Sequence, residues 1–259
     1  MAIKVYILKK SIMKSSVDEY LEMKAEIKEK KRLEKQTNPE KTLEEKQKKD
    51  LRAVFVSTSD TALQALEIAG ISYEGDIDLD DIEFCKVESQ QKCICGNLHI
   101  PKLSDVLGEK IRMYFFANRR NIVIIDDEEF AEKLIKRIIA SRTKPGQSRE
   151  RFLYSFCIKF MDTDLDNLGR YEKKIMQIEE QITVDDLDDV TTKIAHLRKE
   201  LLILREYYDE LHDFGKQLEE NENNFFSGKN LAYFGTISDR ADRLMGRTMY
   251  LLDYIGQVR

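Results

Sequence analysis

The stretch that decides the fold is residues 187–218, LDDVTTKIAHLRKELLILREYYDELHDFGKQL. Its apolar residues recur at alternating spacings of three and four, and Gly215 occupies the one step without a large side chain. This heptad pattern is typical of helices that pack lengthwise against one another. It consists of Leu187, Val190, Ile194, Leu197, Leu201, Leu204, Tyr208, Leu211 and Leu218. We therefore predict one long helix that belongs to a helical bundle.

The segment before it has a looser version of the same spacing, over residues 161–182. The two segments are joined by TVDDLDD at 183–189, where the hydroxyl of Thr183 can cap the second helix. A short connection between two amphipathic segments predicts a pair of antiparallel helices.

The last segment, about residues 230–259, predicts a further rod-like helix. Its three-four spacing runs through Phe234, Ile237, Ala241, Leu244, Thr248, Leu251, Ile255 and Val258. Helices commonly end at Gly or Asn with a change of pattern, but Gly246 and Gly256 lie inside this run. We therefore expect the helix to continue past Arg259 and the chain to be part of a longer protein.

Residues 1–145 have a different character, with short β-prone runs separated by turn residues. The runs are residues 3–8, 51–57, 82–89, 92–100, 110–118 and 121–127. Helices are expected at 58–70, capped by Thr58 or Ser59 and ended by Gly70, and at 127–142. This alternation predicts an α/β fold: a mixed sheet flanked by helices over 1–145, followed by a long-helix region over 146–259.

A charged insert at about residues 14–50 interrupts the α/β region. Its Lys and Glu residues are interleaved, which favours a solvated surface helix or helix pair over a partner-binding arm. A break at Asn38-Pro39 and partial disorder are the alternatives.

Composition narrows the class of protein. Charged residues make up 35% of the chain, above the usual quarter, as expected for solvated helices. The net charge of -5 gives no reason to expect a nucleic-acid partner, because phosphate binding needs an excess of Lys and Arg. Four scattered cysteines fit a reducing cytosol, and no apolar window reaches the length needed to cross a bilayer.

Three segments resemble the CorA family of magnesium and cobalt transporters. They are RFLYSFCIKFMDTDLDNLGRYEKKIMQIEEQI at 151–182, LRKELLILREYYDEL at 197–211 and YFGTISDRADRLMGRTMYLLDYIGQVR at 233–259. The first resembles one long cytoplasmic helix of the family and the last resembles its stalk helix. The likeness covers residues 80–259, whereas residues 1–75 match poorly.

The resemblance implies a homopentamer in the cell membrane, with this segment as its cytoplasmic regulatory domain. In the family, regulatory Mg2+ ions bound between subunits hold the closed state, and the stalk leads into membrane helices. The implied ligands are Asp239 on the stalk and Asp76 and Asp78 in the GDIDLDD loop. Thr236 stands where many members carry the stalk acid, and a solvated acidic loop is the favoured explanation of Asp76 and Asp78.

Other acidic groups are weaker candidates for cation binding. Asp162, Asp164 and Asp166 lie near a further family acid, and residues 185–189 crowd four aspartates at a helix start. A charged outer face or an ordinary capped first turn accounts for both.

Two rival interpretations remain from the sequence. Cys85, Cys93, Cys95 and His99 could hold zinc, although the single-residue gap between two cysteines favours buried free thiols. No HExxH motif, nucleophile elbow or glycine-rich phosphate loop occurs, so we do not expect an enzyme. The alternatives to a CorA-type transporter of Mg2+ or Co2+ are a ZntB-like zinc transporter domain and a soluble coiled-coil interaction protein that is complete as it stands.

Overall fold

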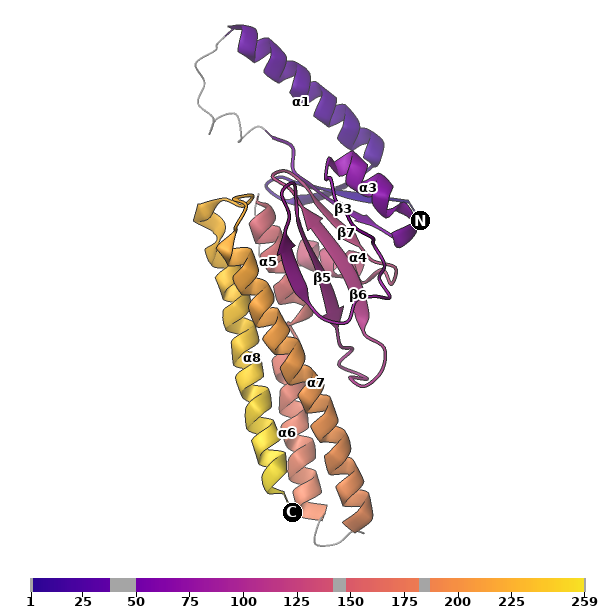
Figure 1. The fold of residues 1–259 in the computed structure, drawn as a ribbon, viewed down its shortest axis with the longest axis vertical. Coiled ribbons are helices and arrows are strands. Elements are labelled where there is room, and N and C mark those ends of the chain that lie inside the picture. The colour runs from indigo at the N-terminus through magenta and orange to yellow at the C-terminus, as the bar shows by residue number, and fades with distance from the viewer. Residues whose placement is uncertain (1, 38–49, 142–147, 182–186, 259) are drawn as a thin grey trace.

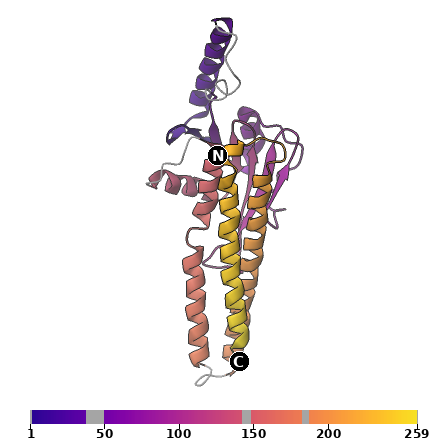
Figure 2. The same ribbon diagram turned by 90° about the vertical axis from the view of Figure 1, so that its left-hand side faces the viewer.

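The chain forms a seven-stranded sheet from which a rod of three long helices extends (Figure 1). The computed structural model describes residues 2–37, 50–141, 148–181 and 187–258. A view turned by 90° shows the same long helices running side by side (Figure 2). The predicted fold class, a mixed sheet with helices followed by long helices, is confirmed.

The sheet is mixed because one of its strand pairs is parallel. Its order is β2 (Ile12–Ser15), β1 (Lys4–Leu8), β3 (Ala53–Ser57), β7 (Ile122–Ile125), β6 (Ile111–Ala117), β5 (Ile94–Ile100) and β4 (Lys86–Ser89). β3 and β7 pair in parallel, and all other neighbours pair antiparallel. Strand β2 was not predicted, because this short edge strand buries only Ile12 and so lacks an alternating pattern.

Alternate residues of the central strands pack on opposite faces of the sheet, as the two-residue period of a strand requires. On β3, Val54 and Val56 belong to the main hydrophobic core, whereas Ala53 and Phe55 belong to a second cluster. Helix α3 (Ala62–Ala69) packs on the second cluster. Helices α4 (Phe130–Ala140), α5 (Arg149–Phe160) and α7 (Leu187–Glu220) contribute to the main core.

The charged insert begins as α1 (Val17–Thr37), which projects from the sheet (Figure 1). Its anchor is Tyr20, only 2% exposed, whose ring meets Phe55 edge-on at 5.0 Å. The hydroxyl of Tyr20 accepts a hydrogen bond from Asn121 Nδ2 at 2.9 Å. The predicted surface helix is therefore confirmed for residues 17–37, while Asn38-Pro39 lies outside the described residues.

The rod consists of α6 (Asp164–Gln181), α7 and α8 (Ala232–Gln257). Of the predicted heptad residues of α7 whose side chains the structure describes, Ile194 is partly buried and the others are buried, with Leu201, Leu204 and Leu211 fully inaccessible. One core runs from the sheet into the rod, across residue 145. The chain therefore changes from a sheet to long helices near residue 145, but the two parts share one hydrophobic core. The division into two domains stays a prediction.

Two expectations about helix ends were wrong. Residues 151–182 do not form one helix, because α5 ends at Phe160, residues 161–163 form a turn and α6 begins at Asp164. Arg240 on α8 stabilises this break by donating from its guanidinium to the carbonyl oxygen of Met161 at 3.0 Å. The second error concerns the start of α3, which was expected at residue 58 and lies at Ala62.

A 3-10 turn, η1 (Ser59–Thr61), precedes α3, so neither Thr58 nor Ser59 caps that helix. The Ser59 hydroxyl instead donates to Asp127 at 2.7 Å. Gly70 ends α3 with φ of 69°, as predicted for a left-handed C-cap. The cap predicted at Thr183 falls outside the described residues, and among those described no helix is both long and apolar enough to traverse a lipid bilayer.

Candidate functional site

Asp239 lies in the second turn of α8, on the exposed side of the helix. Its neighbours Ile237, Ser238 and Ala241 are buried, whereas Asp239 is exposed. Its carboxylate forms no ion pair or hydrogen bond with the residues that the structure describes. Thr236 does not substitute for an acid, because its hydroxyl carries no charge; the hydroxyl donates to the carbonyl of Ala232 at 3.0 Å.

Asp76 and Asp78 lie in the loop between α3 and β4, and both are exposed. The intervening Ile77 and the following Leu79 pack on the second hydrophobic cluster and so fix the loop to the sheet. Asp78 accepts a hydrogen bond from the backbone N–H of Asp80 at 2.9 Å. The loop therefore presents these carboxylates to solvent.

Within one copy of the chain the predicted ligands do not form one site. The loop of Asp76 and Asp78 packs on the second cluster, whereas α8, which carries Asp239, packs on the main core. Across the described ranges, no group of three or more His, Cys, Asp or Glu residues could hold a metal ion. A shared ion would need ligands from a second copy, and the three residues remain predicted ligands.

The acids near the start of α6 have a structural role that links three helices. Asp162 pairs with Lys159 at 2.6 Å and lies 3.9 Å from Arg240. Asp164 is buried and accepts a hydrogen bond from the Tyr208 hydroxyl of α7 at 3.1 Å. Burial raises the pKa of Asp164 to about 6. Asp166 is exposed, as expected for the outer face of a helix.

Sequence patterns gave no indication that Tyr208 and Arg240 complete this network, because their partners are distant in the chain. Of the aspartates at 185–189, the first two lie outside the described residues.

The four cysteines are buried and free, and they do not converge on one point. Cys93 and Cys95 belong to the second cluster, whereas Cys85 belongs to the main core. The thiol of Cys85 accepts from the backbone N–H of His99 at 3.2 Å. Burial raises the pKa of Cys85, which favours the neutral thiol over the thiolate that zinc requires.

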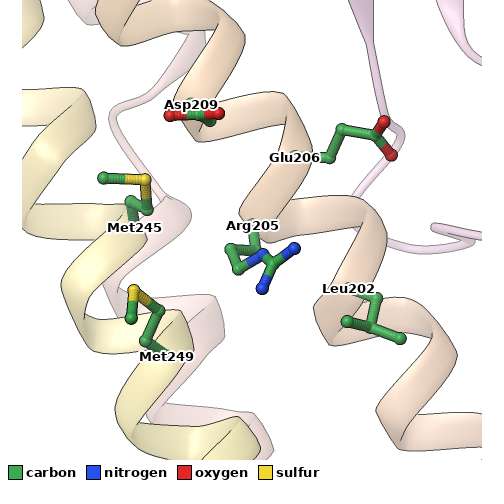
Figure 3. A pocket seen from close by; sticks show the side chains of 6 residues that line it. All are labelled: Leu202, Arg205, Glu206, Asp209, Met245 and Met249. Atoms are coloured by element: carbon green, nitrogen blue, oxygen red, sulfur yellow. The ribbon is translucent and has the colours of Figure 1, made fainter.

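A groove runs between α7 and α8 on the surface of the rod (Figure 3). Met245 and Met249 lie on the α8 side of the groove and Arg205 on the α7 side, with Leu202 one turn from Arg205 (Figure 3). The groove holds about 490 Å³, and Met249 is 49% exposed. Glu206 and Asp209 complete a charged rim around this partly apolar floor. Such a surface suits an apolar side chain of another helix.

Comparison with known proteins agrees with the sequence resemblance. The family profile described as CorA-like Mg2+ transporter protein matches residues 54–259. The family match therefore begins further toward the N-terminus than residue 80, where the sequence resemblance was expected to start, and it includes part of residues 1–75. No curated protein sequence matches the chain significantly.

Solved structures share the fold at low sequence identity. The complete CorA magnesium transporter from Methanocaldococcus jannaschii aligns with a TM-score of 0.68 at 12% identity, over 100% of this chain and 75% of that one. The soluble domain of the same transporter gives 0.65 at 13%, over 99% and 94%. The ZntB cytoplasmic domain from Vibrio parahaemolyticus gives 0.61 at 10%, over 99% and 95%. At these identities the alignments show the fold alone.

Proposed function

Since the chain belongs to the family of CorA-like Mg2+ transporter proteins, we propose that it is the cytoplasmic regulatory domain of a transporter of divalent cations, Mg2+ or Co2+. The observation that carries this proposal is the family match over residues 54–259. Members of this family are transporters rather than enzymes. In the proposed protein the domain senses cytoplasmic cations, and α8 is the stalk that controls the pore.

The extent of the structural alignments supports the assignment to the soluble part of such a transporter. The chain covers 94% of a CorA soluble domain but 75% of a complete CorA transporter. We propose that the transporter resides in the cell membrane, that helices after α8 cross it, and that five copies surround the ion path. The groove between α7 and α8 then provides an apolar contact for the neighbouring copy.

The exposed carboxylates supply chemistry suited to sensing. Mg2+ prefers oxygen ligands, and Asp239, Asp76 and Asp78 are exposed without an ion pair to a described residue. An ion shared by Asp239 of one copy and Asp76 or Asp78 of the next would stabilise only the arrangement that brings them together. Loss of that ion at low cytoplasmic Mg2+ would release the stalk.

The test is protection of the purified chain from limited proteolysis by Mg2+, at protein concentrations where sedimentation shows an oligomer. We expect Mg2+ to slow cleavage, and Asp239→Asn and Asp76→Asn to shift the protective concentration at least tenfold upward. Asp253→Asn is the matched control, because Asp253 is an exposed acid of the same helix about 21 Å further along.

The outcomes separate the alternatives. Absence of protection by Mg2+ and Co2+, or equal loss in Asp253→Asn, would refute the sensing site. Protection by Zn2+ alone would favour the zinc-transporting alternative, since the ZntB cytoplasmic domain shares the fold. An oligomer unaffected by any of these ions would favour the coiled-coil interaction protein.

A further inference from the structure

A second cavity lies at the end of the rod that adjoins the sheet, far from the C-terminal end of α8. It holds about 620 Å³ where the start of β3, the β6–β7 turn, the N-terminus of α5 and the α7–α8 loop meet. Five cationic side chains line it: Arg52, Arg119, Arg120, Arg149 and Lys229. We refer to this cavity and these five residues as the basic pocket.

The cations of the basic pocket outnumber its acids. The two lining carboxylates are Asp50 and Glu150. Asp50 is shared between Lys31 and Arg120, the latter at 3.5 Å. In the described parts of the chain, neither Arg119 nor Lys229 has a carboxylate within ion-pair distance. Arg119 and Lys229 therefore carry positive charge that no described carboxylate pairs with, in a protein whose overall charge is negative.

Glu150 is engaged in holding the pocket together. It is 2% exposed and accepts from the backbone N–H of Ser227 at 3.0 Å and from Asn230 Nδ2 at 3.3 Å. Its carboxylate lies 3.6 Å from the guanidinium of Arg149, which is 6% exposed. These contacts leave Glu150 little capacity to neutralise the remaining cations.

Arg149 joins the separate walls of the pocket. Its guanidinium donates to the carbonyl oxygens of Asn118 in the β6–β7 turn and of Phe225 in the α7–α8 loop, the latter at 2.8 Å. Burial, opposed by Glu150 and assisted by the nearby cations Arg52 and Arg119, lowers the pKa of Arg149 to about 10. The cluster is therefore self-repelling, and a bound anion would relieve the repulsion.

The geometry points to an organic phosphate of nucleotide size as the ligand of the basic pocket. Guanidinium groups bind phosphate oxygens through paired hydrogen bonds, and several of them here converge on one cavity. The N-terminus of α5 adds the positive end of a helix dipole at Ser148. The volume is typical of small-molecule sites and much larger than inorganic phosphate requires.

Phe225 supplies an apolar wall for the organic part, and Arg119 stacks over its ring at 5.7 Å. Because the α7–α8 loop forms one side of the cavity, a bound phosphate would tie the start of α8 to the sheet.

Isothermal titration of the purified chain with ATP, in EDTA so that cation binding does not contribute, tests this proposal. We expect a dissociation constant in the micromolar range at low salt and at least tenfold weaker binding in the double variant Arg119→Gln/Lys229→Gln. Both side chains are exposed, so the fold should be retained, which circular dichroism would verify. Arg198→Gln is the matched control, because Arg198 is an exposed arginine outside the pocket, on α7.

Four outcomes would overturn the proposal. They are no binding of ATP at millimolar concentration, equal weakening by Arg198→Gln, inorganic phosphate binding as tightly as ATP, and binding to phosphatidylcholine–phosphatidylserine vesicles without binding of ATP. Failure of ATP binding would leave the Mg2+ proteolysis test unaffected, so the two proposals fail separately.

Discussion

At Gly215, the backbones of α7 and α8 approach more closely than at any other glycine of the rod. Replacement of Gly215 by alanine should therefore push α7 and α8 apart. A Cβ atom there would lie 2.5 Å from Ser238 Oγ, 2.9 Å from Ser238 N and 3.1 Å from Phe234 O. Two of these atoms belong to the α8 backbone, so a side-chain rotation cannot remove the clash. Ser238 Oγ is also held in place, since it donates to the carbonyl of His212 at 3.0 Å.

The expected magnitude follows from opposing contributions. Alanine is favoured over glycine within a helix by about 1 kcal/mol, whereas overpacking a rigid contact costs about 1–3 kcal/mol. Displacing Ser238 would forfeit a buried hydrogen bond, worth about 1 kcal/mol. We therefore expect Gly215→Ala to lower the free energy of unfolding by about 1–3 kcal/mol in net terms.

Urea denaturation followed by circular dichroism measures this change, with Gly169→Ala on α6 as the control. No atom lies within 4 Å of the Cβ position at Gly169, so that variant should be stabilised by up to about 1 kcal/mol. If both variants gain stability by the same amount, α7 and α8 do not meet closely at Gly215 and the reasoning is wrong.

Two further predictions concern buried polar groups. Because burial raises the pKa of Asp164 to about 6, the folded state binds its proton more tightly than the unfolded state, and stability should fall as the pH rises from about 4 to about 7. At about 1.4 kcal/mol per pKa unit, the loss in the free energy of unfolding is about 3 kcal/mol. The loss should vanish in Asp164→Asn. Parallel profiles of unfolding free energy against pH for the two proteins would contradict this prediction. Asn121, 2% exposed, donates to Tyr20 and to the Ala69 carbonyl and accepts from the Ala53 N–H. Asn121→Ala should therefore cost about 2–4 kcal/mol in urea denaturation and Tyr20→Phe about 1 kcal/mol, and equal losses would refute this ranking.

Periodicity predicted the rod correctly because the pattern is local. The alternating apolar spacing in residues 187–218 records directly which side of α7 is buried, and the structure buries that side. The break between α5 and α6 was not predictable in this way, because Arg240, which bonds the Met161 carbonyl, belongs to another helix. Strand β2 was missed since one buried residue cannot establish a period.

The candidate sites depend still more on contacts between distant residues. Family resemblance singled out Asp239, and the structure leaves it exposed, but a single sequence carries no information on how copies of the chain meet. The basic pocket gave no sequence signal, because Arg52, Arg119, Arg149 and Lys229 are scattered through a chain of net negative charge. Only the folded chain gathers them.

The attachment of α8 differs between its two halves, and this difference bears on the proposed gating. The first half is held through backbone carbonyls, by Ser238 on His212 and by Arg240 on Met161. The second half also buries Leu251 and Ile255 in the main core, but its polar contacts with α6 are side-chain pairs, such as Arg247 with Glu172 at 2.6 Å, which are about one third exposed. Exposed ion pairs contribute at most about 1 kcal/mol. Asp239 lies in the first half of α8, so a cation bound there would add to the contacts of the half that is already anchored. The cleavage sites that Mg2+ protects should therefore lie in the second half of α8, which has the weaker polar contacts.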